Sequence, residues 1–280
     1  MRAAIVQSSY IPWKGYFSLI HLVDRFVFYD DVQYTRQDWR NRNRIRTPDG
    51  LHWLTIPIEV KGRRFQRVCD ARVSEPGWAE RHWRTIEFNY RHAACHAEIA
   101  PQLQALYESC AGETRLSAIN GRFIAAICTL LRIPTALSWS MDYRLGEGRT
   151  ERLVDLCRQL GASEYLSGPA ARTYLHPSLF EQAGIRVCWM DYRGYTDYAQ
   201  LHGPPCIHEA SIVDLLFNLG GEGAAAHLAA FRRRAEGTVF APNAPQASLS
   251  TLPPAGLAPP GTGDGGPEPT RPAIRPGGAL

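Results

Sequence analysis

Residues 1–44 read MRAAIVQSSYIPWKGYFSLIHLVDRFVFYDDVQYTRQDWRNRNR, and this stretch decides the fold. Ala3 to Val6 is a short apolar run, which predicts a buried strand. Residues 7–10 form a polar loop, and Pro12 suits the first turn of the helix that follows. Residues 25–29 are rich in β-forming side chains and predict a second strand. A strand, a helix and a strand in this order form a βαβ unit, whose two strands are parallel and adjacent.

Polar side chains follow both of these strands. Because open parallel sheets bind ligands at the carboxyl ends of their strands, residues 7–10 and 30–33 are expected at one edge. The next segment, residues 36–44, carries four arginines in nine positions, and paired guanidinium hydrogen bonds suit phosphate or carboxylate. Alternatively, Asp30 and Asp31 only end a strand and the arginines form a solvated face. The binding residues expected here are Gln7, Tyr10, Trp13, Arg36, Trp39, Arg40, Asn41, Arg42, Asn43 and Arg44.

Composition restricts the class of protein. The chain has 280 residues and a modest net charge of +4, enough for one substantial globular core. It contains no apolar stretch of membrane-spanning length and no signal-peptide pattern, so we expect a cytoplasmic protein. Seven cysteines occur without a CxxC spacing, and we therefore predict reduced thiols and no metal site.

A β-hairpin insertion is predicted near residues 44–73. Residues 47–50, Thr-Pro-Asp-Gly, form a turn between two strand-like runs, and residues 66–73 suggest a further strand. Between them, Lys61 belongs to a basic turn with Arg63 and Arg64. We expect a flap over the ligand edge that contacts a diphosphate, with an exposed hairpin tip as the alternative. Apolar stripes then predict helices over residues 78–89, 95–109 and 117–131.

The second half of the chain resumes the alternation of strands and helices. Strands are predicted at 136–140, 163–167 and 185–190, with helices at 150–160 and 178–183, which again implies parallel pairing. Ser167 and Gly168 form a candidate ligand loop at a strand end. The fold class is therefore α/β, a mainly parallel sheet flanked by helices, in a single domain of residues 1–236. Residues 237–280 are rich in proline and glycine and predict a disordered tail.

The last helix is predicted over residues 207–218. His208 lies at its start, and Ser211 and Asp214 lie in its first turns, where a helix attracts anions. A carboxylate on an apolar helix needs a partner, so we predict that Asp214 pairs with an arginine of the 40–44 segment or orients it toward a ligand. A purely structural salt bridge to one of these arginines is the alternative. The Gln7 loop, Asp31, these arginines and Asp214 would then surround one pocket.

Several stretches together carry a resemblance to a known family. They are IVQSSYIPWKGYF, DRFVFYDDVQYTRQDWRNRNRIRTPDGLHWLTIPI, TERLVDLC, ASEYLSGPAARTYL and ASIVDLLFNLGG. Over about residues 3 to 224 the chain resembles the WbqC-like family of bacterial O-antigen and polysaccharide clusters. Many relatives open with His-Gln-Pro where this chain has Val6-Gln7-Ser8, and many place an aromatic residue where Cys206 stands. A role for a histidine at position 6 is therefore absent here.

The resemblance implies a transferase that attaches an amino acid such as glycine, or another acyl group, to an amino sugar of a surface polysaccharide or a similar amine. Such a transfer needs a base and oxyanion donors. The base candidates are Asp30, Asp31 and His208, and Asn89 is a further binding candidate. The expected partners are an amino sugar or nucleotide-sugar and an activated acyl donor. No cofactor can be identified, and no specific nucleic-acid binding is expected, although a tRNA could be the donor.

Two other classes stay open. The strand–loop–helix opening also suits a nucleotidyltransferase-like enzyme, but the paired-histidine signature of that class is missing. A non-catalytic nucleotide-sugar binding protein is the second alternative. Neither a Walker loop nor a Rossmann glycine fingerprint occurs, and the sequence does not identify the donor, the acceptor or the mode of activation.

Overall fold

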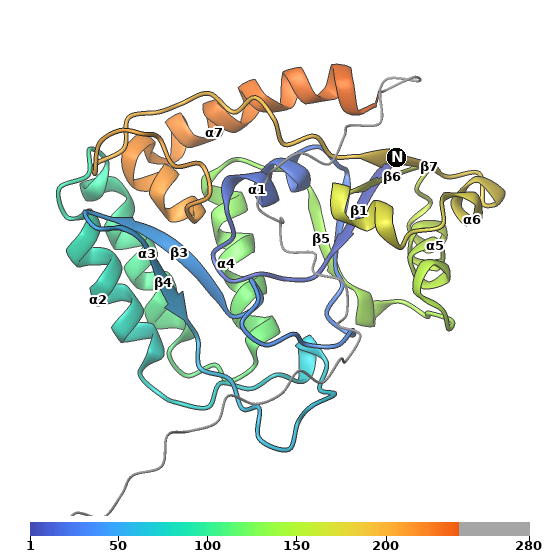
Figure 1. Cartoon of the computed structure of the whole chain (residues 1–280), viewed down its shortest axis with the longest axis horizontal. Coiled ribbons are helices and arrows are strands. Elements are labelled where there is room, and N and C mark those ends of the chain that lie inside the picture. The colour runs from blue at the N-terminus through green and yellow to red at the C-terminus, as the bar shows by residue number, and fades with distance from the viewer. Residues whose placement is uncertain (241–280) are drawn as a thin grey trace, which may run out of the picture.

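The computed structural model describes residues 1–240, and its centre is a five-stranded parallel sheet in the order β5-β2-β1-β6-β7 (Figure 1). The strands are β1 (Arg2–Val6), β2 (Arg25–Phe28), β5 (Ala136–Trp139), β6 (Glu164–Ser167) and β7 (Arg186–Trp189). The predicted βαβ unit is confirmed, because Ala4 of β1 lies opposite Phe26 of β2 in parallel register. The α/β fold class is confirmed with it.

Alternation along the strands distributes the apolar side chains between two cores. Ala4 and Val6 belong to the larger core with α1, α4 and α7, whereas Ala3 and Ile5 belong to the smaller core with α5 and α6. Successive side chains of a strand point to opposite faces, so the continuous apolar run of β1 results from a strand covered on both sides.

Seven helices surround the sheet within the described residues. They are α1 (Lys14–His21), α2 (Trp78–Tyr90), α3 (His96–Cys110), α4 (Leu116–Leu130), α5 (Arg149–Leu160), α6 (Pro177–Gln182) and α7 (Ile212–Val239). The helices α2 to α6 begin and end within one residue of their predicted bounds. Three short 3₁₀ turns add to them: η1 (Val68–Asp70), η2 (Ser140–Asp142) and η3 (Pro169–Thr173).

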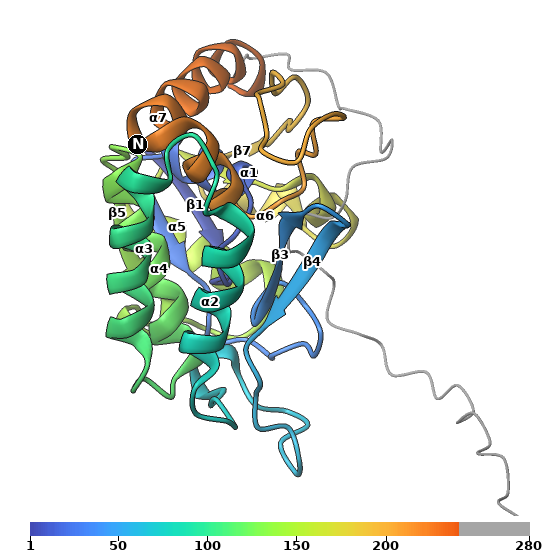
Figure 2. The ribbon, with the colours of Figure 1, turned by 90° about the vertical axis from the view of Figure 1, so that its left-hand side faces the viewer.

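The predicted insertion contains a two-stranded hairpin, β3 (Arg42–Thr47) and β4 (Gly50–Thr55). Figure 2 shows it beside α2, and β3 also contacts α7. The predicted strand over residues 66–73 is wrong, because this segment forms η1 and makes only isolated bridges such as Gln33 with Arg67. Single bridges with different partners satisfy its backbone, so no ladder extends along it.

The last helix starts later and runs further than predicted. Ser211 is its N-cap, and its hydroxyl accepts a hydrogen bond from the Val213 N–H at 3.3 Å. The helix therefore begins at Ile212 rather than at residue 207, and it continues to Val239, into the first residues of the predicted tail. Residues 241–280 lie outside the described part. The Ser211 N–H donates to the Arg44 carbonyl at 2.8 Å, so the start of α7 lies beside β3.

Candidate functional site

A cavity of about 550 Å³ lies at the carboxyl edge of the sheet. The ends of three neighbouring strands line it: Val6 and Gln7 at β1, Tyr29 after β2, and Ser167 at the end of β6. Ligands of parallel sheets bind at this edge, and the volume lies within the usual range of small-molecule sites. The structure thus brings together two of the predicted residues, Gln7 and Ser167.

The start of α5 forms another wall of this cavity. Residues 146–149, Gly-Glu-Gly-Arg, and Arg152 line it. Gly148 has a φ of 92°, and a β-carbon there would overlap the Glu151 carboxylate, so the loop requires glycine. The first N–H groups of a helix lack intrahelical partners and carry partial positive charge. With Arg149 and Arg152 beside them, this wall favours an anionic ligand.

Two tyrosines place aromatic rings next to these arginines. The guanidinium of Arg149 lies 5.5 Å from the Tyr174 ring centroid, and that of Arg152 lies 5.4 Å from the Tyr29 centroid. Both tyrosines line the cavity, and burial raises the pKa of Tyr29 to about 12. The wall therefore combines cations with planar apolar surface, which suits a ligand with both a phosphate and a ring.

Asp31, a predicted catalytic residue, lies beside the cavity and holds one of its arginines. Its carboxylate forms an ion pair with Arg152 and accepts a hydrogen bond from the Ser140 hydroxyl. Asp31 follows β2 and Ser140 follows β5, so two adjacent strand ends fix this carboxylate. Because both of its oxygens have partners, Asp31 is better placed to orient Arg152 than to accept a proton.

Asp30, the second predicted catalytic residue, is fully buried and does not line the cavity. It accepts hydrogen bonds from the Ser8 N–H at 2.7 Å, from the Ser8 hydroxyl at 2.6 Å, and from Ser117. Burial raises its pKa, although these hydrogen bonds oppose the shift. Asn120 donates to Ser8 and to the carbonyl of Arg40, so Asp30 belongs to a polar network that fixes the loop after β1.

The arginines of the 40–44 segment are not among the residues that line the cavity. Arg40 is buried, and its guanidinium donates a hydrogen bond to the Ser9 hydroxyl at 2.9 Å. Arg42 and Arg44 are half-buried, and their guanidinium carbons lie 4.2 and 5.3 Å from the Trp53 ring centroid. They alternate with buried residues because β3 presents one face to solvent. Arg40 precedes this strand and is buried, so its environment differs from that of Arg42 and Arg44.

Asp214 is buried, and its carboxylate has hydrogen-bond partners on several parts of the chain. It accepts hydrogen bonds from Tyr90 at 2.9 Å, Tyr198 at 2.6 Å and Gln200 at 2.7 Å. The predicted pairing with an arginine of the 40–44 segment is wrong, because neutral donors occupy this carboxylate. Arg46 of the hairpin joins this network through two of the donors, because its N–H donates to Tyr90 and its guanidinium donates to Gln200.

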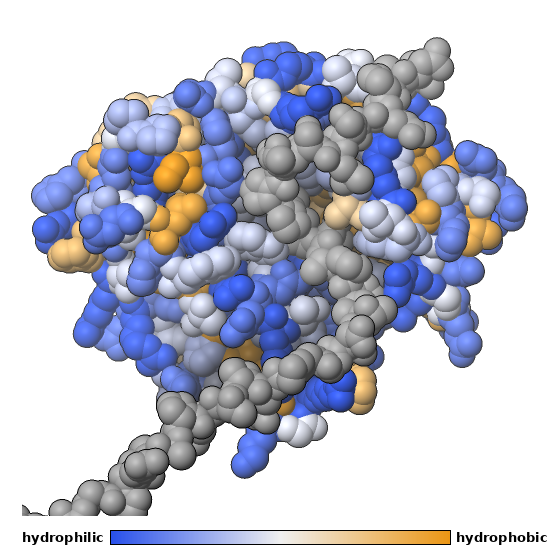
Figure 3. All heavy atoms as spheres, viewed as in Figure 1, coloured by the Kyte–Doolittle hydropathy of each residue, from blue (hydrophilic) through white to orange (hydrophobic). Residues whose placement is uncertain are grey.

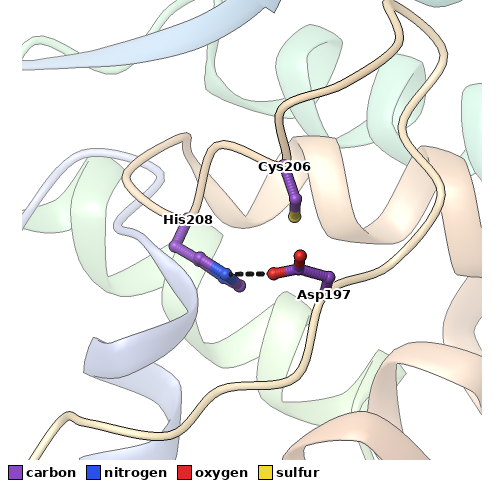
Figure 4. Close-up of side chains that lie close together, drawn as sticks. All are labelled: Asp197, Cys206 and His208. Atoms are coloured by element: carbon purple, nitrogen blue, oxygen red, sulfur yellow. Dashed lines mark hydrogen bonds and ion pairs between the residues drawn. The ribbon is translucent and has the colours of Figure 1, made fainter.

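His208, the third predicted catalytic residue, lies in a different place, next to a second cavity of about 270 Å³. Its Nε2–H donates to Asp197 at 2.8 Å, so its Nδ1 accepts from the Lys14 ammonium at 2.7 Å. Lys14 is buried, which lowers its pKa to about 8. Figure 4 shows Cys206 beside His208 and Asp197. Trp13, a predicted binding residue, lines this smaller cavity.

The other predicted residues serve the scaffold or lie away from both cavities. Tyr10 is buried between His82 and Tyr107. Trp39 is half-buried against Trp53, and Ser211 caps α7. Backbone carbonyls accept hydrogen bonds from Arg36, Asn41, Asn43 and Asn89. Lys61 is exposed, and Gly168 has an ordinary negative φ.

The predicted basic flap does not cover the cavity. The hairpin packs on α2 and α7, and the basic turn lies near the rim, where the Gln33 amide donates to the Arg64 carbonyl at 3.3 Å. Gln33 itself lines the cavity. Figure 3 shows the hydropathy of one face of the molecule. Where this face is not covered by grey atoms, hydrophilic side chains predominate and hydrophobic ones form only small patches.

The sequence prediction missed the wall formed by residues 146–152. A signal was present, because Gly146 and Gly148 precede a helix that opens with Arg149 and follow a strand. A glycine-rich turn between a strand and a helix start is a common anion site. The cluster of Asp197, Cys206 and His208 was also missed, and its spacing carries no recognisable metal signature.

The chain is similar to known proteins. A model described as the WbqC-like protein family matches residues 7–226. The chain is 52% identical over 223 residues to the uncharacterized protein Rv1507c of Mycobacterium tuberculosis, a match that covers 79% of this chain and 95% of that protein. No solved structure gives a significant match. Within residues 1–240, no helix is long and apolar enough to cross a membrane.

Proposed function

This chain belongs to the WbqC-like protein family, and we propose that it is a transferase that attaches an amino acid such as glycine, or another acyl group, to the amine of an amino sugar. The acceptor would be a nucleotide-linked amino sugar, used for a surface polysaccharide or a related product. The cavity at the carboxyl edge of the sheet would be the site of transfer.

One observation carries this proposal: the cavity joins the ends of β1, β2 and β6 to the glycine-containing start of α5. A diphosphate would lie against the first N–H groups of α5, with Arg149 and Arg152 neutralising its charge. Tyr29 and Tyr174 would contact the rings of the nucleotide or sugar. Asp31 would hold Arg152 in position through their ion pair.

The lining residues also suggest how the chemistry would proceed. Among them, Glu147 alone carries a carboxylate. The amine of the acceptor would attack the acyl carbonyl, the bond to the leaving group of the donor would break, and Glu147 would accept the amine proton. The side chains of Gln7 and Ser167 would donate hydrogen bonds to the oxyanion that forms.

Binding tests the proposal first. Isothermal titration of the full chain with UDP-glucosamine and with UDP should show binding to both. Arg149→Gln should weaken this binding about tenfold or more, because a hydrogen bond to a charged group contributes about 1.5–3 kcal/mol. Arg158→Gln, on the last turn of the same helix, is the matched control and should bind as wild type. An equal loss of affinity in both variants, or an unchanged affinity in Arg149→Gln, would show that the ligand does not bind in this cavity.

Transfer tests the reaction. The protein, UDP-glucosamine and either glycyl thioester or glycyl-tRNA should give N-glycylated product, detected by mass spectrometry. Glu147→Gln should lower the rate about a hundredfold or more, in the range of general base catalysis, while binding of UDP-glucosamine stays intact. Binding without product from any donor would favour the alternative of a nucleotide-sugar binding protein.

A further inference from the structure

A cluster of three different metal-binding side chains lies outside the proposed site. Asp197, Cys206 and His208 belong to the segment of residues 190–211, which connects β7 to α7 without a helix or strand. A carboxylate oxygen, the Cys206 Sγ and a ring nitrogen of His208 all lie within 4.8 Å of one another. Figure 4 shows the three side chains pointing toward a common centre. We propose that they bind a zinc-like divalent cation.

The donor set determines which cation fits. A thiolate and an imidazole favour Zn²⁺, whereas Mg²⁺ and Ca²⁺ prefer oxygen ligands alone. Tetrahedral zinc bonds of ~2.0–2.3 Å place neighbouring donor atoms ~3.3–3.8 Å apart. The His208 Nε2 and the Asp197 oxygen, 2.8 Å apart, would have to separate by about 0.5 Å. The other donor atoms, at most 4.8 Å apart, would have to approach by no more than about 1.5 Å. The ligands come from an irregular segment, which can adjust more easily than a helix or strand.

The neighbours of His208 hold its ring in place for such an ion. The Nε2–H donates to Asp197 at 2.8 Å, and Nδ1 accepts from Lys14 at 2.7 Å. Lys14 is 2% exposed, with Tyr195 and Tyr198 each 5.1 Å from its nitrogen. The ion would replace the Nε2 proton and the Cys206 thiol proton. The Lys14 proton that faces Nδ1 would pass to the ring, so the ligand stays a neutral imidazole whose Nδ1–H donates to the Lys14 amine. Lys14 thus orients the ligand from outside the coordination sphere.

Three protein ligands leave a fourth position for water or for a ligand atom. His208 also lines the cavity of about 270 Å³ with Trp13, Tyr195 and Glu209. An ion on its Nε2 would lie at the border of this cavity. The lining residues of this cavity and of the sheet-edge cavity do not overlap. The metal site is therefore separate from the proposed transfer site.

Cobalt is a suitable probe, because Co²⁺ takes the place of Zn²⁺ in tetrahedral sites and is coloured. The full chain, freed of metals and kept reduced, should bind one equivalent of Co²⁺. Its spectrum should show a thiolate-to-cobalt charge-transfer band together with intense visible bands of tetrahedral coordination. Zn²⁺ should displace Co²⁺ and abolish both features.

Variants separate this site from other cysteines and histidines. Cys206→Ser should remove the charge-transfer band, and Asp197→Asn should weaken Co²⁺ binding at least tenfold. The Asp197 side chain is 79% exposed, so its replacement tests coordination without disturbing the fold. Cys69→Ser, at another half-buried free cysteine, is the matched control and should bind as wild type. A charge-transfer band that persists in Cys206→Ser, its absence from wild type, or unchanged affinity in Asp197→Asn would overturn the proposal.

Discussion

His82 shows how one buried residue depends on its hydrogen-bond partners. Its Nε2–H donates to the Thr55 carbonyl at 3.2 Å, so Nδ1 must accept from the Tyr10 hydroxyl at 2.8 Å. The Tyr107 hydroxyl can then donate to Tyr10 at 2.6 Å. Burial lowers the pKa of His82 to about 4. Protonation of Nδ1 would both charge the core and break the bond from Tyr10.

Acid should therefore destabilise the protein through His82. In the unfolded chain the residue takes up a proton below a pH of about 6.5, whereas in the folded protein it stays neutral down to about 4. The contribution of the neutral His82 ring to the free energy of unfolding is fully present above about pH 6.5. It is lost as the pH falls from there to about 4, by up to about 3 kcal/mol at the lower end. Urea unfolding at pH 7.5, 6 and 5 measures this decrease.

The matched variants isolate the contribution of this histidine. His82→Asn should be less stable than wild type at pH 7.5 but should lose less stability on acidification. His92→Asn, at an exposed position, should keep the acid dependence of wild type. An acid dependence that is identical in wild type and His82→Asn would contradict the assignment of the neutral buried ring.

At the scale of elements, α7 changes direction at a glycine. Gly220 has φ 69° and ψ 178° inside the span of α7, so two helical pieces meet there. The Gly221 N–H, released by the break, donates to the Glu98 carboxylate at 2.8 Å. A partner on α3 thus satisfies a backbone group that a continuous helix would have paired with itself. Before the break, Asp214 lies close to the hairpin and α2. After it, α7 reaches the start of β1, where Glu236 lies 3.8 Å from Arg2 (Figure 1).

Gly220→Ala should destabilise the protein. An alanine must adopt a left-handed backbone, and its β-carbon would lie 2.5 Å from a Glu98 oxygen and 3.3 Å from the Cys95 sulfur. We expect a loss of about 1–3 kcal/mol in the free energy of unfolding. Gly237→Ala, in the same helix with no neighbouring atom within 4 Å of the new β-carbon, should be neutral or stabilising. Equal effects of the two replacements in urea unfolding would show that the break at Gly220 is not required.

At the scale of the whole molecule, the buried carboxylate of Asp214 connects distant parts of the chain. Its three donors come from α2 and from the irregular segment before α7, and Arg46 reaches the same group from the hairpin through Tyr90 and Gln200. The carboxylate therefore fixes how the hairpin, α2 and α7 assemble, and satisfied buried networks of this kind specify one arrangement.

Asp214→Ala should be strongly destabilising, because it leaves buried donors of Tyr90, Tyr198 and Gln200 without an acceptor. Each unsatisfied group costs about 1–3 kcal/mol, so we expect a total loss of about 3 kcal/mol or more. Glu222→Ala, at an exposed carboxylate of the same helix, should change stability by less than about 1 kcal/mol. Thermal unfolding followed by circular dichroism and tryptophan fluorescence measures both variants. A loss below about 1 kcal/mol in Asp214→Ala would mean that the network does not hold these elements together.

The sequence alone indicated most of the helices and strands and the parallel pairing of the sheet. The apolar run of β1, the β-forming residues of β2 and the apolar stripes of α2 to α4 are local patterns, because burial repeats along each element with its own period. The βαβ opening then implied parallel pairing and the edge at which Gln7 and Ser167 meet. This reasoning needs no knowledge of how distant elements pack.

The tertiary structure decided the roles of the polar residues. Asp30, Asp31 and Asp214 look alike in sequence, but one is buried in a serine network, one pairs with Arg152, and one accepts from tyrosines and a glutamine. The same holds for Glu147 and Arg149 at the cavity. A polar side chain takes the partner that three-dimensional packing brings within about 3 Å. Because that partner can lie more than about a hundred positions away in the chain, no local pattern encodes it.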